Sequence, residues 1–197
     1  HAIGDRANRE TLDLFAGLFE GRPDGRDVRW RIEHAQHLDP ADIPRFAELG
    51  VIASMQGVHC TSDAPYVVAR LGERRARLGA YAGALFTNGT YVPVERIDPI
   101  ASFYASITRD VPGQEPFFAE QRMTRAEALR SYTLDCAYAA FEEQQKGSLS
   151  PGKLADVVVL SRDLLTVPVD EVRQTRVLYT IVGGRVVYEA AHESDAR

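Results

Sequence analysis

Two histidines stand where they could share one metal ion. His1 opens the segment HAIGD, and His34 follows the strand-like segment RIE, one helix and one strand further along the chain. Because consecutive parallel strands of a barrel deliver their C-terminal residues to the same rim, the two imidazoles would meet there. Imidazole nitrogen is a common ligand of zinc. The spacing therefore predicts a metal site on His1 and His34. For His34 the alternative is a strand-end histidine that bonds only backbone and solvent.

Helical and strand patterns alternate through the first part of the chain. Apolar residues at helical spacing predict helices over residues 12–19, 39–49 and 64–78. Asp39-Pro40 is expected to start the second of these, as an acceptor cap followed by a proline. Short apolar or alternating runs predict strands over residues 28–34, 51–55 and 84–87. This alternation indicates a parallel sheet with right-handed crossovers, so the fold class is α/β.

The pattern changes after about residue 110. The capping box that starts at Thr124 and ends at Glu127 predicts a helix that continues to about Gln145. A turn-rich stretch follows, and then β-rich runs over residues 155–160 and 177–182. Gly183-Gly184 is expected to turn the second run into a hairpin. The last part of the chain is therefore predicted to be a small antiparallel β segment.

Composition excludes several classes of partner. The chain of 197 residues has a net charge of −5 and is 45% hydrophobic, so it carries no basic footprint for nucleic acid or for an anionic membrane. Its longest apolar runs are the size of strands, too short to span a bilayer. Cys60 and Cys136 are isolated, with no spacing typical of a metal knuckle or a redox pair. A cytoplasmic location is the expectation.

Four segments together resemble the amidohydrolase superfamily, within it the family-3 branch that includes N-substituted formamide deformylase-like enzymes. They are HAIGD (1–5), RIEHAQ (31–36), SMQ (54–56) with His59 and Asp63, and GSLSPGKLAD (147–156). These segments occur in the family's order over nearly the whole chain. Each segment alone is weak evidence for the family, but the four together are specific for it.

The resemblance implies the C-terminal half of a (β/α)8 TIM barrel, about strands five to eight, followed by a small β-rich segment of the companion β-sandwich. The expected divisions are a partial barrel over residues 1–146, the β segment over residues 147–189 and a frayed tail over residues 190–197. The first strands of the barrel would lie upstream, so the chain is expected to be a fragment of a longer enzyme.

The resemblance also assigns roles to individual residues. It implies one or two divalent metals, most often zinc, with His1 ending strand five and His34 ending strand six. Gln56, His59 and Asp63 match a loop that faces the substrate. The alternative for the last two is a polar loop in which Asp63 caps the next helix.

Two departures from the family pattern concern the metal site. The His-x-His pair of the first strand and a further mid-barrel ligand would lie upstream of His1. In addition, the segment GTYVPV (89–94) places Tyr91 where the family has a metal-binding, proton-shuttling aspartate. Because a phenol titrates at about pH 10, it cannot replace a carboxylate as the base at neutral pH. The sequence therefore gives no certain catalytic residue.

Three neighbouring residues carry smaller predictions. Asp5 would either orient His1 or place a negative charge at a helix N-terminus, and the helix role is favoured. Glu33 is expected to pair with a nearby arginine, because it lies on the strand face opposite to its neighbour His34. His37 is expected to be solvated.

The resulting hypothesis is a fragment of a metal-dependent enzyme that hydrolyses a non-peptide C–N bond in a small amide, formamide or cyclic amide through a metal-activated water. With only two ligands, this chain alone is expected to be impaired. The alternative is a catalytically dead half-barrel that serves as an assembly module. Its uncovered edges would then pair with a second copy or with a missing N-terminal half.

Overall fold

The computed structural model describes residues 1–21, 27–78 and 86–191. A parallel sheet forms the centre of the first part of the chain, with its strands in the order β1 (Arg31–Glu33), β2 (Ile52–Met55) and β3 (Phe86–Asn88). Ala2 forms a further parallel bridge with His34, just past the end of β1. The predicted alternation of helices and strands and the predicted parallel sheet are thus observed. Of the predicted strand over 84–87, residues 84 and 85 lie outside the described residues.

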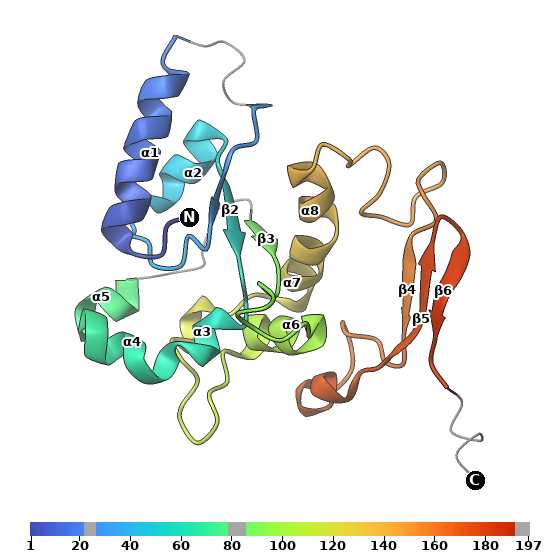
Figure 1. Ribbon diagram of the computed structural model, residues 1–197. Coiled ribbons are helices and arrows are strands. Elements are labelled where there is room, and N and C mark those ends of the chain that lie inside the picture. Colours follow the sequence, from blue (N-terminus) through green and yellow to red (C-terminus); the bar gives the residue numbers. More distant parts are fainter. Residues whose placement is uncertain (22–26, 79–85, 192–197) are drawn as a thin grey trace.

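Two helices cover this sheet and form the first core. Helix α1 (Asp5–Phe19) precedes β1, and α2 (Ile43–Leu49) lies between β1 and β2 (Figure 1). Both contribute apolar side chains that pack against the sheet. The buried members of this core are Ala2, Leu12, Ile32, Ala35, Leu38, Phe46, Val51, Ala53 and Met55. The core therefore lies directly beneath the strand ends that carry the two histidines.

The prediction that α2 starts at Asp39-Pro40 is wrong by a few residues. Asp39 instead closes a turn, in which its side chain accepts from the Ala41 N–H and its carbonyl from the Asp42 N–H. Aspartate side chains commonly stabilise such turns. The helix then begins at Ile43, with Pro44 in its first turn.

The helix predicted over residues 64–78 is two helices. They are α4 (Ala64–Leu71) and α5 (Glu73–Leu78), and the short α3 (His59–Ser62) precedes them. Gly72 separates α4 from α5 with a φ of 76°. Glycine reaches this conformation without steric cost, so the chain changes direction there.

The helix predicted from Thr124 to Gln145 is also interrupted. Its capping box is confirmed, with reciprocal bonds between Thr124 and Glu127 at the start of α7 (Arg125–Tyr132). At Thr133 the backbone leaves the helical region, and α8 (Leu134–Ala139) follows. The Thr133 hydroxyl donates to the carbonyl of Leu129, a back-bond that competes with regular helix geometry.

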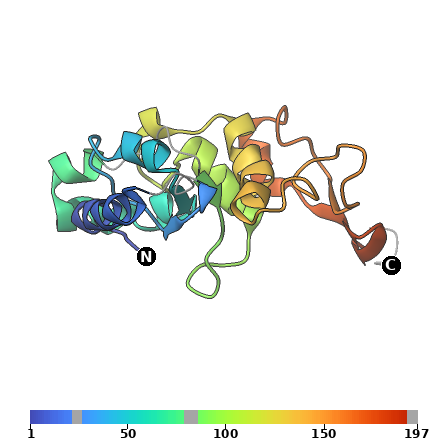
Figure 2. The same ribbon diagram turned by 90° about the horizontal axis from the view of Figure 1, so that it is seen from above.

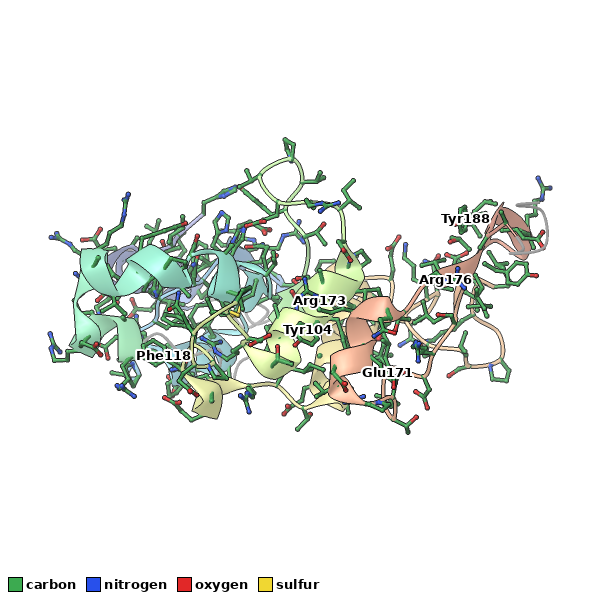
Figure 3. The ribbon with its side chains drawn as sticks, turned by 90° about the horizontal axis from the view of Figure 1, so that it is seen from below. Tyr104, Phe118, Glu171, Arg173, Arg176 and Tyr188 are labelled. Atoms are coloured by element: carbon green, nitrogen blue, oxygen red, sulfur yellow. The ribbon has the colours of Figure 1, made fainter. Side chains whose placement is uncertain are left out.

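A second core joins these helices to the remaining segments. Helix α6 (Pro99–Thr108) and the 3-10 turn η3 (Val169–Gln174) contribute to it, whereas the 3-10 turn η2 (Ala119–Gln121) has no buried residue. The buried members of this core are Phe103, Ala128, Leu164, Val167 and Val172. Figure 3 shows Arg173 beside Tyr104 where η3 meets α6, with the guanidinium carbon 5.3 Å from the ring centre.

The predicted antiparallel segment is confirmed as the sheet β4 (Val157–Leu160), β5 (Val177–Val182) and β6 (Arg185–Glu189). Gly183 and Gly184 both have positive φ in its hairpin, as a two-residue primed turn requires. Figure 2 shows this sheet at the end of the molecule opposite to α4 and α5. No helix in the described ranges combines the length and apolar character that crossing a membrane requires.

One buried guanidinium ties the segment before β1 to the segment after α8. Arg29 donates to both carboxylate oxygens of Glu143, at 2.8 and 2.9 Å, and to the carbonyl of Tyr138. Its guanidinium carbon also lies 3.8 and 4.2 Å from the ring centres of Tyr138 and Phe141. Bonding to Glu143 raises the pKa of Arg29, so the charge persists. A bidentate pair between two rings fixes its partners strongly.

The burial pattern of α1 leads to a stability prediction. Leu12 is 0% exposed and Leu14 is 61% exposed. We expect Leu12→Ala to lower the free energy of unfolding by about 2–5 kcal/mol, because it leaves a cavity under the sheet. Leu14→Ala, the matched control in the same helix, should change it by less than about 0.5 kcal/mol. Urea unfolding followed by circular dichroism measures both, and equal effects would contradict this packing.

Candidate metal centre

His34 is held at the end of β1 by an unusual backbone. Its φ is 73°, and that of Ala35 is 42°, so two successive non-glycine residues occupy the left-handed region. Such residues cost about 1–3 kcal/mol each and persist only where their surroundings enforce them. Here the His34 N–H donates to the carbonyl of Ser54 at 2.8 Å, and the Ala35 side chain is fully buried. The ring position is therefore closely constrained.

The neighbours of His34 also fix its tautomer. Its Nδ1 lies 2.9 Å from Oε1 of Gln56, whose own Nε2 donates to the Ser54 carbonyl. That second bond orients the Gln56 amide so that its oxygen faces the imidazole. Because an amide oxygen only accepts, Nδ1 of His34 donates to Gln56, and in the neutral tautomer Nε2 then presents a lone pair. Metal-binding histidines are oriented by this kind of bond.

The structure brings the ring of His1 to that lone pair. Nδ1 of His1 lies 3.3 Å from Nε2 of His34, as the sequence analysis expects of two rings on a common rim. The N–H of Ala2 donates to the carbonyl of Glu33, which fixes the two segments side by side. Two nitrogens on a tetrahedral zinc at about 2.0–2.1 Å are about 3.3–3.4 Å apart. The pair thus fits a metal, and its role as ligands stays a prediction.

Asn8 connects the two loops that carry these histidines. It is 0% exposed in α1, and its Nδ2 donates to the carbonyls of Ala2, Gly4 and His37 at 3.0–3.2 Å. With the amide flipped, its oxygen would face three other oxygens, so the assignment follows from the network. The role of Asn8 could not be found from the sequence, because an asparagine in a helical pattern does not indicate which groups its side chain will bond.

Two further rings, those of His59 and Tyr91, lie beside the histidine pair. The ring of His59, at the start of α3, stacks on that of His34 with centroids 5.6 Å apart. The Tyr91 ring meets His34 edge-on at 4.5 Å and His59 at 5.8 Å, and its hydroxyl lies 3.3 Å from Nδ1 of His1. Burial lowers the pKa of His59, so its ring favours the neutral form. Of the residues that the resemblance places near the pair, His59 and Tyr91 therefore lie beside it.

Gln56 and Asp63, predicted to face the substrate, are bonded to protein groups. Gln56 is buried behind His34, as described above. The Asp63 carboxylate accepts from Nε2 of Gln36 at 2.5 Å and from the Tyr66 hydroxyl. Although Asp63 precedes α4, its side chain makes no cap hydrogen bond, so the alternative of a helix cap is wrong. A contact with substrate stays a prediction for both.

Of the smaller predictions, two agree with the structure. Asp5 lies in the first turn of α1 and pairs with Arg75, whose hydrogen bonds lower the pKa of the Asp5 carboxyl. Glu33 pairs with Arg31 at 3.0 Å, as expected, and also accepts from the Ser54 hydroxyl.

The prediction that His37 is solvated is wrong. The residue is half-buried, and its Nδ1 lies away from solvent with no hydrogen-bond partner among the described residues. Its backbone N–H donates to the carbonyl of Ile3, which draws the loop against α1. Burial lowers the pKa of His37 as a result.

Within residues 1–21, 27–78 and 86–191, no three histidine, cysteine, aspartate or glutamate side chains converge on a point that would hold a metal ion. The described part of the chain therefore offers the imidazoles of His1 and His34 with the phenol of Tyr91 beside them. Two lone pairs at ligand spacing can bind a divalent metal, which in a complete site would activate water.

Comparison with known proteins relates this geometry to metal-dependent hydrolases. A crystal structure of an uncharacterized metal-dependent hydrolase from Pyrococcus furiosus superposes with a TM-score of 0.70 and 32% sequence identity, over 84% of this chain and 33% of that one. Residues 1–188 match the amidohydrolase family. The chain belongs to that family, which confirms the resemblance found in the sequence.

Two curated relatives extend the comparison. Protein LONG AFTER FAR-RED 3 of Arabidopsis thaliana is 39% identical over 95% of this chain and 33% of its own length. The N-substituted formamide deformylase of Arthrobacter pascens is 27% identical over 96% of this chain and 36% of its own length. The chain therefore spans about a third of the length of the relatives it matches.

Asn8 gives a prediction about the geometry of the site. We expect Asn8→Ala to lower the free energy of unfolding by about 1–3 kcal/mol, because the carbonyls of Ala2 and His37 lose the donor that ties the two loops together. The imidazole NMR signals of His34 should also shift, because the two loops are no longer tied. Glu10→Ala, an exposed control in the same helix, should leave both nearly unchanged. Unchanged His34 signals in the Asn8 variant would contradict the role.

His37 gives a prediction about pH. Its unfolded-state pKa is about 6.5, and its folded-state pKa is lower. The unfolded chain therefore binds the proton first. The stability contribution is complete above about pH 6.5 and is lost as the pH falls towards the folded-state pKa.

We expect the urea midpoint of the wild-type chain to fall between about pH 7.5 and about pH 5, and to fall less in His37→Gln, which cannot take up the proton. The nearby carboxylates of Asp63 and Asp5 reduce the effect, whereas burial and the charges of Arg75 and Arg109 increase it. Equal pH dependence in the two proteins would show that His37 is solvated after all.

Proposed function

We propose that this chain supplies His1 and His34 to the divalent metal centre, with zinc the expected metal, of an enzyme that hydrolyses a C–N bond in a small amide, formamide or cyclic amide. One observation carries the proposal. The lone pair of His34, fixed by Gln56, faces the imidazole of His1 at the spacing of two ligands on one metal ion. Family membership and a relative named as a formamide deformylase support the reaction class.

The proposal includes the position of the chain in its fold. The parallel order Ala2, β1, β2 and β3 supports an assignment to strands five to eight of a TIM barrel. The divisions at residues 1–146, 147–189 and 190–197 belong to the same proposal, with β4–β6 as part of a companion β-sandwich. The missing ligands would come from the other part of the barrel. A cytoplasmic location is part of the same expectation.

Each residue of this chain would have its own role at the proposed metal centre. His34 binds through Nε2, while Gln56 keeps the proton on Nδ1. Asn8 holds the loop of His1 against that of His34, and the neutral ring of His59 closes one side. The metal, when bound, supplies Lewis-acid activation of water. A second imidazole alone does not complete a site that needs three or more ligands, so turnover by this chain alone should be small.

The alternative function, an assembly module without catalysis, has one observation in its favour. The sheet β4–β6 leaves large apolar side chains exposed, where soluble proteins rarely leave such residues together. They include Val158, Val159, Val182, Val186, Val187 and Tyr188. A second copy of this chain is the occupant that this alternative predicts. Sedimentation with metal analysis discriminates: a chain without metal favours the module, whereas about one bound zinc per site favours the metal centre.

The metal prediction is tested by zinc binding. We expect the purified chain to take up about one zinc ion at saturation, weakly and in a form that chelators remove. His34→Ala should abolish this uptake, because it removes the oriented lone pair. His37→Gln, which changes a histidine just outside the pair, should retain it. Zinc per chain is measured by elemental mass spectrometry, and equal binding by His34→Ala would reject the proposed centre.

Activity provides the second measurement. The chain alone should turn over N-formyl and cyclic amides slowly or not at all. Rapid turnover that is lost both with a chelator and in His34→Ala would show that the two imidazoles suffice, contrary to this expectation.

A further inference from the structure

The loop that follows β2 contacts His34 at both of its ends. Oε1 of Gln56, at its start, lies 2.9 Å from Nδ1 of His34, and the ring of His59 stacks on the same imidazole with centroids 5.6 Å apart. The two residues between them, Gly57 and Val58, are held by other elements, because their backbone N–H groups donate to side chains of β3 and α6. The position of Gln56 at His34 therefore depends on what holds its neighbour Gly57.

Asn88, which ends β3, accepts the first of these bonds. Its Oδ1 receives the Gly57 N–H at 2.8 Å, and its Nδ2 donates to the hydroxyl oxygen of Ser106 at 2.9 Å. The Ser106 hydroxyl donates to the carbonyl of Ser102 at 2.9 Å, so its oxygen is left to accept. A flipped amide would set Nδ2 against the Gly57 N–H, so this network turns the Asn88 oxygen toward the loop.

Helix α6 supports the loop directly. The hydroxyl oxygen of Ser102 accepts from the Val58 N–H at 3.1 Å, and α3 lies next to α6 (Figure 1). A Cβ at Gly57 would lie 2.6 Å from the Ser102 carbonyl oxygen and closer still to the Ser106 hydroxyl, so only glycine allows this approach. Asn88, Ser102 and Ser106 are at most 7% exposed, and their bonds are therefore shielded from water.

We infer that Asn88 is a positioning residue for the metal centre. By fixing Gly57, it holds the Gln56 amide against Nδ1 of His34 and keeps Nε2 of His34 turned toward His1. Its effect on metal binding rests on the proposed centre, whereas its effect on the His34 tautomer does not. Residues that orient a metal-binding histidine typically change metal affinity by about 10–100-fold.

The first measurement needs no metal. At about pH 8.5 histidine is neutral, and the nitrogen NMR signals of the His34 ring report which nitrogen carries the proton. We expect the proton on Nδ1 in the wild-type chain and a mixture of both tautomers in Asn88→Ala, because Gln56 is no longer held in place. Ser131→Ala is the matched control, since this buried hydroxyl donates to the Ala128 carbonyl within α7. It should leave the His34 signals unchanged.

The second measurement is zinc affinity against a competing chelator. We expect Asn88→Ala to weaken zinc binding by at least about tenfold and Ser131→Ala by less than about twofold. In a Gln56→Ala background, Asn88→Ala should add less than about a further twofold, because the group through which it acts is gone. Full additivity of the two losses would contradict the route through Gln56.

The outcomes separate this inference from the proposed centre. If Asn88→Ala is folded and keeps the wild-type tautomer, the inference fails and the centre stands. If the wild-type chain binds no zinc, the centre fails and the tautomer measurement still decides the inference. Circular dichroism shows whether each variant is folded. Should Asn88→Ala not fold, Ser106→Ala takes its place, since it removes only the group that orients the amide and should shift the tautomer in the same direction.

Discussion

The hydrogen bond between His34 and Gln56 is the interaction on which the chemistry of this chain depends. An imidazole can present either nitrogen, and only the bond that its other nitrogen makes decides which one is free. Gln56 is itself oriented by the Ser54 carbonyl, and the same carbonyl receives the His34 N–H. The end of β2 therefore fixes both the backbone and the ring orientation of the residue that follows β1. Pairing of the parallel strands β1 and β2 thus prepares the position of the His34 ring.

That preparation requires strain, and buried contacts maintain it. His34 and Ala35 are left-handed, and Ala35 belongs to the buried core that also contains Leu12 and Phe46. Asn8 adds polar contacts from the other side, through carbonyls of both loops. The packing of the core therefore supports the geometry of the site. A substitution that loosens α1 should first affect the strained backbone at His34 and Ala35.

The sequence could predict the parts of this structure that leave a local pattern. Helical periodicity, the capping box at Thr124 and the glycine hairpin at Gly183 each involve residues close in the chain, and each is observed. The breaks at Gly72 and Thr133 were missed, because a glycine or threonine inside a helical pattern is often tolerated.

Side-chain bonding across the chain could not be predicted in the same way. The convergence of His1 and His34 follows from the alternation of strands and helices, which is visible along the sequence and predicts neighbouring parallel strands. The bonds of Asp63 to Gln36 and Tyr66, and the burial of His37, follow from packing between loops, which has no sequence period. For the same reason Asp63 reads as a helix cap although its carboxylate bonds elsewhere.

The charge balance of the site limits what this chain can do without further groups. Three carboxylates that stand near the histidines in the sequence motifs are already engaged, Asp5 by Arg75, Glu33 by Arg31 and Asp63 by Gln36 and Tyr66. If the proposed metal were bound, the imidazoles of His1 and His34 would hold it without adding negative charge. A proton acceptor for hydrolysis would therefore have to be a neutral base at the site, such as the buried ring of His59, or a carboxylate from another part of the enzyme.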